Sequence, residues 1–175
     1  KAPQAGRQEV ILLGSAGQRV ITAGELLCIA GLTAGLKTTL KNEYNLTVLR
    51  GPSISELILS PEDIDFTGID NPSVMVALDQ EGVDRRRNLF ERLTKDALII
   101  QTGGVSLPAT KARIHNVDFT NQGIKRVDRA LASLAVLAKL NRIISTEMLK
   151  SALKLRFRGN LYSAALAVIG RLGLN

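Results

Sequence analysis

The chain has 175 residues, of which 45% are hydrophobic and 22% are charged, and its formal net charge is +7. This length suits one domain with its own core, and no run of about 18 apolar residues indicates a membrane span. A single cysteine excludes an internal disulfide, and residues 1–9 lack the apolar core of a secretory signal, so we expect a cytoplasmic protein without a membrane partner.

The positive charge is concentrated in the last third of the chain. Residues 1–110 contain 11 Lys and Arg against 13 Asp and Glu, whereas residues 111–175 contain 12 against 3. Clustered cations suit nucleic acid, but the chain has no Trp and few aromatic residues for stacking on bases. We therefore expect no nucleic-acid partner and favour a solvated face, an acidic protein partner or a phosphate-rich ligand.

The first elements form half of a strand–helix–strand unit. The apolar run EVILLG at 9–14 predicts a buried strand that ends at a glycine. In the helix that follows, Val20, Gly24, Leu27 and Gly31 recur at helical spacing. Because this face carries small residues, we expect it to pack closely on the sheet.

Two interpretations of the glycine turn between this strand and helix stay open. Backbone N–H groups at a helix N-terminus suit an anion, and glycines let a phosphate approach closely. A dinucleotide fingerprint, however, has glycine at its first, third and sixth positions, which here hold Gly14, Ala16 and Arg19. The turn is therefore an anion site or only a tight connection, and Arg19 either contacts an anion or pairs with a carboxylate of the chain.

Strands and helices alternate through most of the chain. Further strands are predicted at 36–40, 45–49, 53–60, 73–78, 96–102 and 113–117, with a polar helix over 79–93. The strands at 45–49 and 53–60 could pair as antiparallel neighbours across the turn at 50–52.

This alternation predicts an α/β fold with a Rossmann-like open, mainly parallel sheet flanked by helices, and a helical C-terminal third. We expect a single domain over 1–175, in which 1–7 are linker-like, 8–118 form the sheet core and 125–173 form C-terminal helices.

Few residues suggest catalysis. Cys28 lies among apolar residues of the first helix and is predicted to be a small core residue, and His115 is the only histidine. No metal-ligand spacing and no Ser or Cys triad is present. The polar side chains crowded over 43–56 form either a solvated hairpin or a ligand loop at strand ends. Spacing alone thus predicts a binding or partner domain.

Taken in order, five stretches resemble the gamma subunit or gamma domain of the 2-oxoacid:ferredoxin oxidoreductases, the family of the pyruvate and 2-oxoglutarate synthases. They are Gly14-Ser15-Ala16-Gly17-Gln18, Glu43-Tyr44, Arg50-Gly51 with Ser53, Ser55 and Glu56, VMVALDQEGVDR at 74–85, and RALASLAVLAKL at 129–140. The resemblance covers nearly the whole chain, and the order and spacing of these stretches are specific to the family.

The resemblance implies a role in the CoA-dependent oxidative decarboxylation of a 2-oxo acid to its acyl-CoA, with electrons passed to ferredoxin. It implies thiamine diphosphate and iron–sulfur clusters in partner subunits, namely thiamine-binding alpha and beta subunits and a ferredoxin-like subunit or ferredoxin. Coenzyme A would be a co-substrate, and this chain would bind no cofactor or metal alone.

The resemblance also implies site residues in this chain, none of them catalytic. Candidate contacts to coenzyme A or another anion are Gly14, Ser15, Gly17, Gln18, Arg19, Arg50, Gly51 and Ser53, while Glu43, Tyr44 and Glu56 shape the loops. The alternative function is a free-standing dinucleotide- or CoA-binding regulatory domain without catalytic residues.

Overall fold

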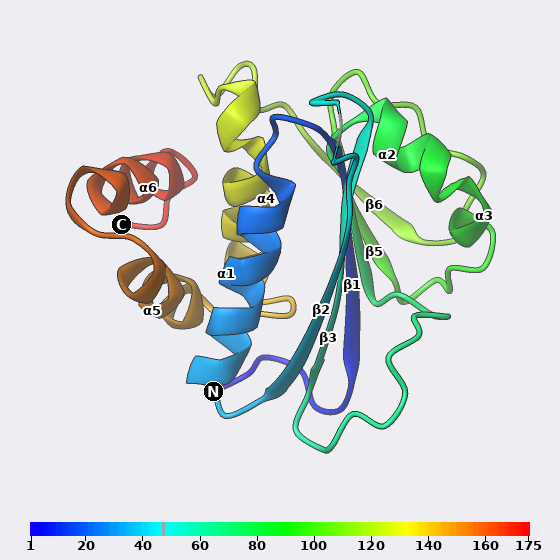
Figure 1. Cartoon of the computed structure of the whole chain (residues 1–175), viewed down its shortest axis with the longest axis horizontal. Coiled ribbons are helices and arrows are strands. Elements are labelled where there is room, and N and C mark those ends of the chain that lie inside the picture. The colour runs from blue at the N-terminus through cyan, green and yellow to red at the C-terminus, as the bar shows by residue number, and fades with distance from the viewer. Residues whose placement is uncertain (47) are drawn as a thin grey trace.

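The computed structural model describes residues 1–46 and 48–175, and Figure 1 shows a twisted sheet with helices on both faces. The strands are β1 (Gln8–Ser15), β2 (Lys37–Glu43), β3 (Pro52–Ser60), β4 (Val74–Ala77), β5 (Leu98–Thr102) and β6 (Arg113–Val117). The helices are α1 (Val20–Thr33), α2 (Gln80–Arg85), α3 (Arg87–Phe90), the 3₁₀ helix η1 (Arg126–Asp128), α4 (Arg129–Lys139), α5 (Thr146–Arg156) and α6 (Gly159–Arg171). Within the described residues, no helix is long and apolar enough to cross a membrane.

The strands form one open sheet in the order β2-β3-β1-β4-β5-β6. The pairs β1–β4, β4–β5 and β5–β6 are parallel, whereas β3 is antiparallel to both β1 and β2. Every strand except β3 therefore points the same way. The predicted α/β fold with a mainly parallel sheet and a helical C-terminal part is confirmed.

The antiparallel hairpin differs from the prediction in its first strand. β3 pairs with β2, not with a strand at 45–49. That predicted strand includes Thr47, which lies outside the described residues, and its other residues belong to the connection between β2 and β3. The reason is tertiary: Thr38 and Leu40 of β2 contact glycines of α1, so the helix covers β2 and selects it as the partner of β3.

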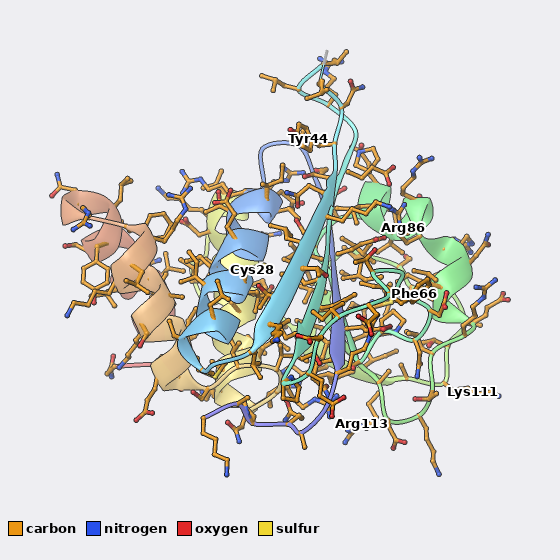
Figure 2. The ribbon with its side chains drawn as sticks, turned by 60° about the horizontal axis from the view of Figure 1, so that its bottom comes forward. Cys28, Tyr44, Phe66, Arg86, Lys111 and Arg113 are labelled. Atoms are coloured by element: carbon orange, nitrogen blue, oxygen red, sulfur yellow. The ribbon has the colours of Figure 1, made fainter. Side chains whose placement is uncertain are left out.

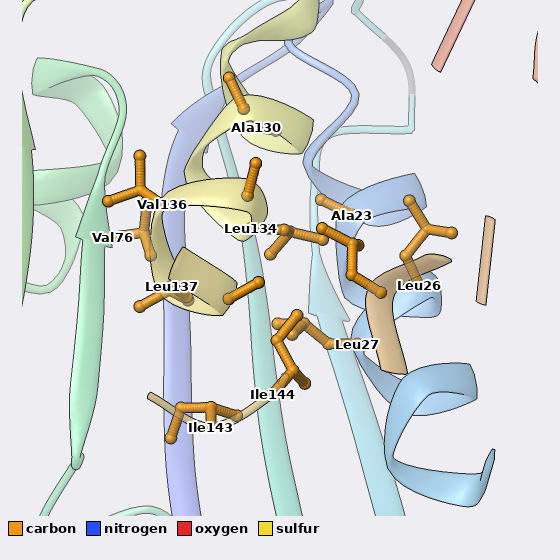
Figure 3. Packing of buried hydrophobic residues seen from close by; sticks show 14 of the residues in the cluster. Ala23, Leu26, Leu27, Val76, Ala130, Leu134, Val136, Leu137, Ile143 and Ile144 are labelled. Carbon is orange, nitrogen blue, oxygen red and sulfur yellow. The ribbon is translucent and has the colours of Figure 1, made fainter. Parts of the chain in front are cut away.

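Each face of the sheet has its own apolar core. Along β1, Val10 and Leu12 face α1 and the C-terminal helices, whereas Ile11 and Leu13 face α2 and α3. Figure 3 shows the larger core, in which Ala23 of α1 lies near Leu134 of α4 and Leu27 lies near Ile144. Because the middle of β1 is buried on both faces, residues 10–13 are all hydrophobic, as the sequence predicts for a central strand.

The predicted polar helix over 79–93 is interrupted. The structure has α2 and α3 instead, separated at Arg86, whose φ of −116° and ψ of 24° are not helical. After the interruption, Phe90 of α3 is fully buried in the core on the face of the sheet that α2 and α3 cover.

Ion pairs join the end of α2 to the β2–β3 hairpin. Arg85 Nε lies 2.7 Å from Glu43 Oε1, Arg86 Nη2 lies 2.5 Å from Glu43 Oε2, and Arg86 Nε lies 3.2 Å from Glu56 Oε1. The hydrogen bond from Arg86 is the largest cause that holds the pKa of Glu43 below its ordinary value. Burial opposes it, and the hydrogen bond from Arg85 adds to the lowering. These contacts fix the hairpin against the second layer.

The start of α2 lies directly against the backbone of β1. A Cβ atom added to Gly82 would lie 2.6 Å from the nitrogen of Gly14 and 2.6 Å from the carbonyl carbon of Leu13. Strand backbone held on both sides by hydrogen bonds cannot move away cheaply. Glycine at this position therefore sets the distance between α2 and the sheet.

We predict that Gly82→Ala lowers the free energy of unfolding by about 1–3 kcal/mol, although alanine is the better helix former. Denaturant unfolding of the purified chain measures this. The matched control is Gly103→Ala, because a Cβ atom at Gly103 meets nothing within 4 Å and its φ is not positive. Equal stabilities of the two variants would contradict the close contact at Gly82.

Glu43→Gln should lower the free energy of unfolding at pH 7 by about 0.5–1 kcal/mol, a value reduced by solvent screening because the Glu43 side chain is 37% exposed. The carboxylate has a lowered pKa in the folded state, so its contribution is present above the unfolded-state pKa, near 4.5, and is lost as the pH falls through the folded-state value.

Urea unfolding between pH 7 and pH 3 measures this difference for the Glu43 variant. The control is Glu91→Gln, at an exposed residue that makes no ion pair with the described residues. Its free energy of unfolding should stay close to that of wild type across this pH range. A difference between wild type and Glu43→Gln that persists undiminished at pH 3 would rule out this origin.

Candidate functional site

The candidate site lies at the carboxyl ends of β1 and β4. β1 continues into α1 on one face of the sheet, and β4 continues into α2 on the opposite face, as Figure 1 shows. In open α/β sheets, ligands bind in the crevice where neighbouring connections leave on opposite faces. The glycine turn of the sequence analysis forms one side of this crevice.

The turn after β1 is closed by a buried glutamine. The Ser15 backbone N–H donates to Gln18 Oε1 at 2.9 Å, and Gln18 Nε2 donates to the carbonyl oxygen of Leu78 at 3.4 Å. Gln18 is only 1% exposed, so its side chain holds the turn together and does not face a ligand. Gly17, in contrast, is exposed, has a φ of 85° and has open space beside it. An anion therefore has access to the turn at Gly17.

Arg126 joins the two sides of the crevice. Its Nη2 atom donates to Ser15 Oγ at 2.6 Å and to Asp79 Oδ2 at 2.9 Å. The other carboxylate oxygen of Asp79 accepts from the Glu81 backbone N–H at 3.1 Å and so caps α2. Asp79 belongs to the stretch 74–85 that resembles the family, whereas no sequence pattern indicates a role for Arg126, which lies 111 residues after Ser15.

Arg19 lies at the start of α1 with its side chain toward solvent. It has a left-handed backbone, with a φ of 56° and a ψ of 35°, and no side chain caps the helix there. Its Nη1 atom is 3.6 Å from Asp128 Oδ1, and the Arg19 side chain is 64% exposed. The first turn of α1 contains no acidic residue and no side-chain cap, so the positive end of its dipole favours an anion there.

The loop before β3 lies beside the turn. The Ala16 backbone N–H donates to the carbonyl oxygen of Gly51 at 3.0 Å, and Gly51 has a φ of 98°, which glycine adopts without strain. Ser53 pairs with Gly14 in the sheet and is buried. Arg50 is exposed and makes no side-chain hydrogen bond or ion pair with residues 1–46 or 48–175.

The predicted anion contacts thus gather at one edge but differ in exposure. Gly17, Arg19 and Arg50 face solvent, whereas Ser15, Gln18 and Ser53 are buried. Of the three residues expected to shape the loops, Glu43 and Glu56 bind the arginines of α2 and its end, and Tyr44 is half-exposed beyond β2, as Figure 2 shows.

Cys28 and His115 lie away from this edge. Burial raises the pKa of the Cys28 thiol, which lies half-buried in α1 beside the core. His115 lies on β6 at the far side of the sheet and is exposed. Across residues 1–46 and 48–175, His, Cys, Asp and Glu side chains form no group of three that could hold a metal ion.

Comparison with protein families and curated proteins identifies relatives that cover between 44% and 84% of the chain and a family that covers most of it. The profile of the family described as pyruvate ferredoxin/flavodoxin oxidoreductase matches residues 9–171. The 2-oxoglutarate synthase subunit KorC of Methanocaldococcus jannaschii is 25% identical over 155 residues, which cover 84% of this chain and 82% of that protein. The KorC subunit of Methanothermobacter marburgensis is 32% identical over 78 residues, which cover 44% of this chain and 42% of that protein.

Solved structures share the fold at low sequence identity. The gamma subunit of a keto/oxoacid ferredoxin oxidoreductase from Geobacter sulfurreducens matches with a TM-score of 0.78 at 20% identity and covers 95% of this chain and 94% of its own. Subunit PORC of the Thermotoga maritima pyruvate oxidoreductase matches with a TM-score of 0.71 at 20% identity and covers 97% of this chain and 96% of its own.

A third structure is a longer chain. The 2-oxoglutarate:ferredoxin oxidoreductase of Magnetococcus marinus, with 2-oxoglutarate, coenzyme A and succinyl-CoA bound, matches with a TM-score of 0.77 at 15% identity over 98% of this chain and 31% of that chain. With a family profile that spans residues 9–171 and a gamma-subunit fold, the chain belongs to the pyruvate ferredoxin/flavodoxin oxidoreductase family.

Proposed function

We propose that the chain acts as the gamma subunit or gamma domain of a 2-oxoacid:ferredoxin oxidoreductase and supports the CoA-dependent oxidative decarboxylation of a 2-oxo acid to an acyl-CoA. In this proposal, its carboxyl edge contacts the phosphates of coenzyme A, and the electrons pass to ferredoxin through partner subunits. The family membership and the chemistry of the β1–α1 edge support the proposal.

The uncapped N-terminus of α1 is the observation that carries the CoA contact. Its free N–H groups, the exposed Gly17 and the solvent-facing Arg19 offer hydrogen bonds and positive charge to a phosphate. Arg50 adds a second exposed cation. It precedes Gly51, whose carbonyl oxygen accepts the Ala16 backbone N–H, so its loop lies beside the turn. Arg126 acts as a positioning residue, because it fixes the Ser15 hydroxyl at the end of β1.

The cofactors of the reaction belong to partner subunits in this proposal. The chain has one cysteine, whereas a cubane iron–sulfur cluster takes four cysteine thiolates. We therefore assign the clusters to partner subunits, and the family resemblance assigns thiamine diphosphate to the alpha and beta subunits. Thiamine diphosphate would supply the carbanion-stabilising chemistry there. This chain would supply substrate binding and subunit contacts.

The complex should require this chain for activity. Co-expression of the chain with the subunits encoded beside it should give a complex that reduces a viologen dye when both a 2-oxo acid and coenzyme A are present. Purification without this chain should abolish the CoA-dependent reaction. A fully active complex that lacks the chain would refute the proposed function, and micromolar binding of NAD by the chain alone would favour the regulatory alternative.

Arg19→Ala should raise the KM for coenzyme A about tenfold and leave kcat nearly unchanged, because a charged hydrogen bond to the phosphate is lost. Steady-state kinetics of the complex measure both constants. Asp128→Asn separates this role from a structural one, since it removes the partner of Arg19 and leaves the cation free. The KM should then stay the same or fall.

Two outcomes would contradict the anion role of Arg19. One is an equal rise of KM in Arg19→Ala and Asp128→Asn, which indicates that only their ion pair matters. The other is an equal rise in the control Arg92→Ala, at an exposed arginine without a side-chain bond to the described residues.

A further inference from the structure

The connection between β2 and β3 carries the most exposed apolar side chains of the described residues. We call residues 44–46 and 48–50 the hairpin tip. Leu49 is 94% exposed and Leu46 is 82% exposed, and Val48 and Tyr44 are each about half-exposed. The tip extends beyond the sheet, past the labelled Tyr44 in Figure 2. Clustered exposed apolar side chains of this kind mark sites of protein association.

Both ends of the tip are held in place. On the β2 side, Glu43 binds Arg85 and Arg86. On the β3 side, the carbonyl oxygen of Gly51 accepts the Ala16 backbone N–H. The apolar residues are therefore presented from a fixed base at the edge of the sheet that carries the candidate site.

Charge restricts the partner that fits the tip. Arg50 is the only charged residue between positions 44 and 50, and Lys41 is exposed on the adjoining strand. Glu43 and Glu56 are paired with the arginines at the end of α2, whereas the exposed Glu81 has its carboxylate beside Gly51 at the base of the tip. A complementary surface is therefore apolar at its centre and acidic where it faces Arg50 and Lys41.

A second copy of this chain does not meet that requirement. Its apolar groove between α1 and α6, with a volume of about 300 Å³, is bordered by Arg19, Lys125 and Arg171. The one carboxylate there, Asp128, already pairs with Arg19. Arg50 and Lys41 of the tip would face like charges in that groove, so insertion of the tip into that groove of a second copy is disfavoured.

We propose that the hairpin tip inserts into an apolar recess with an acidic border on a partner subunit of the oxidoreductase, an inference that rests on the proposed function. Leu46 and Leu49 are the anchors. Lys41 faces the acidic border, and the adjoining candidate site is brought against the partner subunit by the same contact.

The test compares two double variants of the full chain in binding to the remaining subunits of the complex. Leu46→Asp/Leu49→Asp alters the tip, and Leu32→Asp/Leu140→Asp alters two exposed leucines, 58% and 40% exposed, at the C-terminal ends of α1 and α4. We expect the tip variant to melt as wild type does and to bind at least about tenfold more weakly, while the control binds normally. Leu46→Met/Leu49→Met should retain binding.

Wild-type affinity of the tip variant would overturn the inference, as would an equal loss in the control variant. Lys41→Glu should weaken binding at low salt more than at high salt, and equal binding at low salt would overturn the acidic border. If the wild-type chain binds no oxidoreductase subunit, the proposed function fails. If wild type binds and the tip variant binds equally well, only the inference fails.

Discussion

The contact of Gly82 with the backbone of Leu13 and Gly14 determines the geometry of the whole carboxyl edge. It brings the start of α2 against the end of β1, so the capping residue Asp79 lies within reach of Arg126. One turn later the same helix delivers Arg85 and Arg86 to the β2–β3 hairpin. A larger residue would displace both connections at once.

The cations of this edge fall into two groups with different roles. Arg86 and Arg126 are engaged with carboxylates and tie neighbouring elements together, although half of the Arg126 side chain is exposed. Arg19 and Arg50 stay exposed and leave positive charge at the surface of the crevice. The positive charge available to a ligand at this edge therefore comes from the arginines without a close carboxylate partner. The net charge of the chain does not show which arginines these are.

Local patterns were enough to predict most of the elements. Buried strands such as β1 and β4, the glycine turn and the small-residue face of α1 follow from short-range periodicity. The partner of β3 was predicted wrongly, because α1 packing on Thr38 and Leu40 decides it. Arg126 binds Ser15, which lies 111 positions earlier in the chain, so no local sequence pattern could indicate this contact. Residue patterns offered an anion role for Gly17, Arg19 and the loop with Arg50 only as one of two alternatives, and the resemblance to a known family was needed to join them into one site.

The central position of β1 also affects how the protein opens. Its backbone is bonded to β3 on one side and to β4 on the other, and both of its faces are buried. Amide hydrogens of this strand exchange with solvent only when the whole domain unfolds. β2 lies at the sheet edge and is bonded on one side alone, so its amides exchange through local fraying. Local fraying of β2 therefore leaves the strand that carries the glycine turn intact, and the ion pairs of Glu43 hold the end of β2 that adjoins the tip.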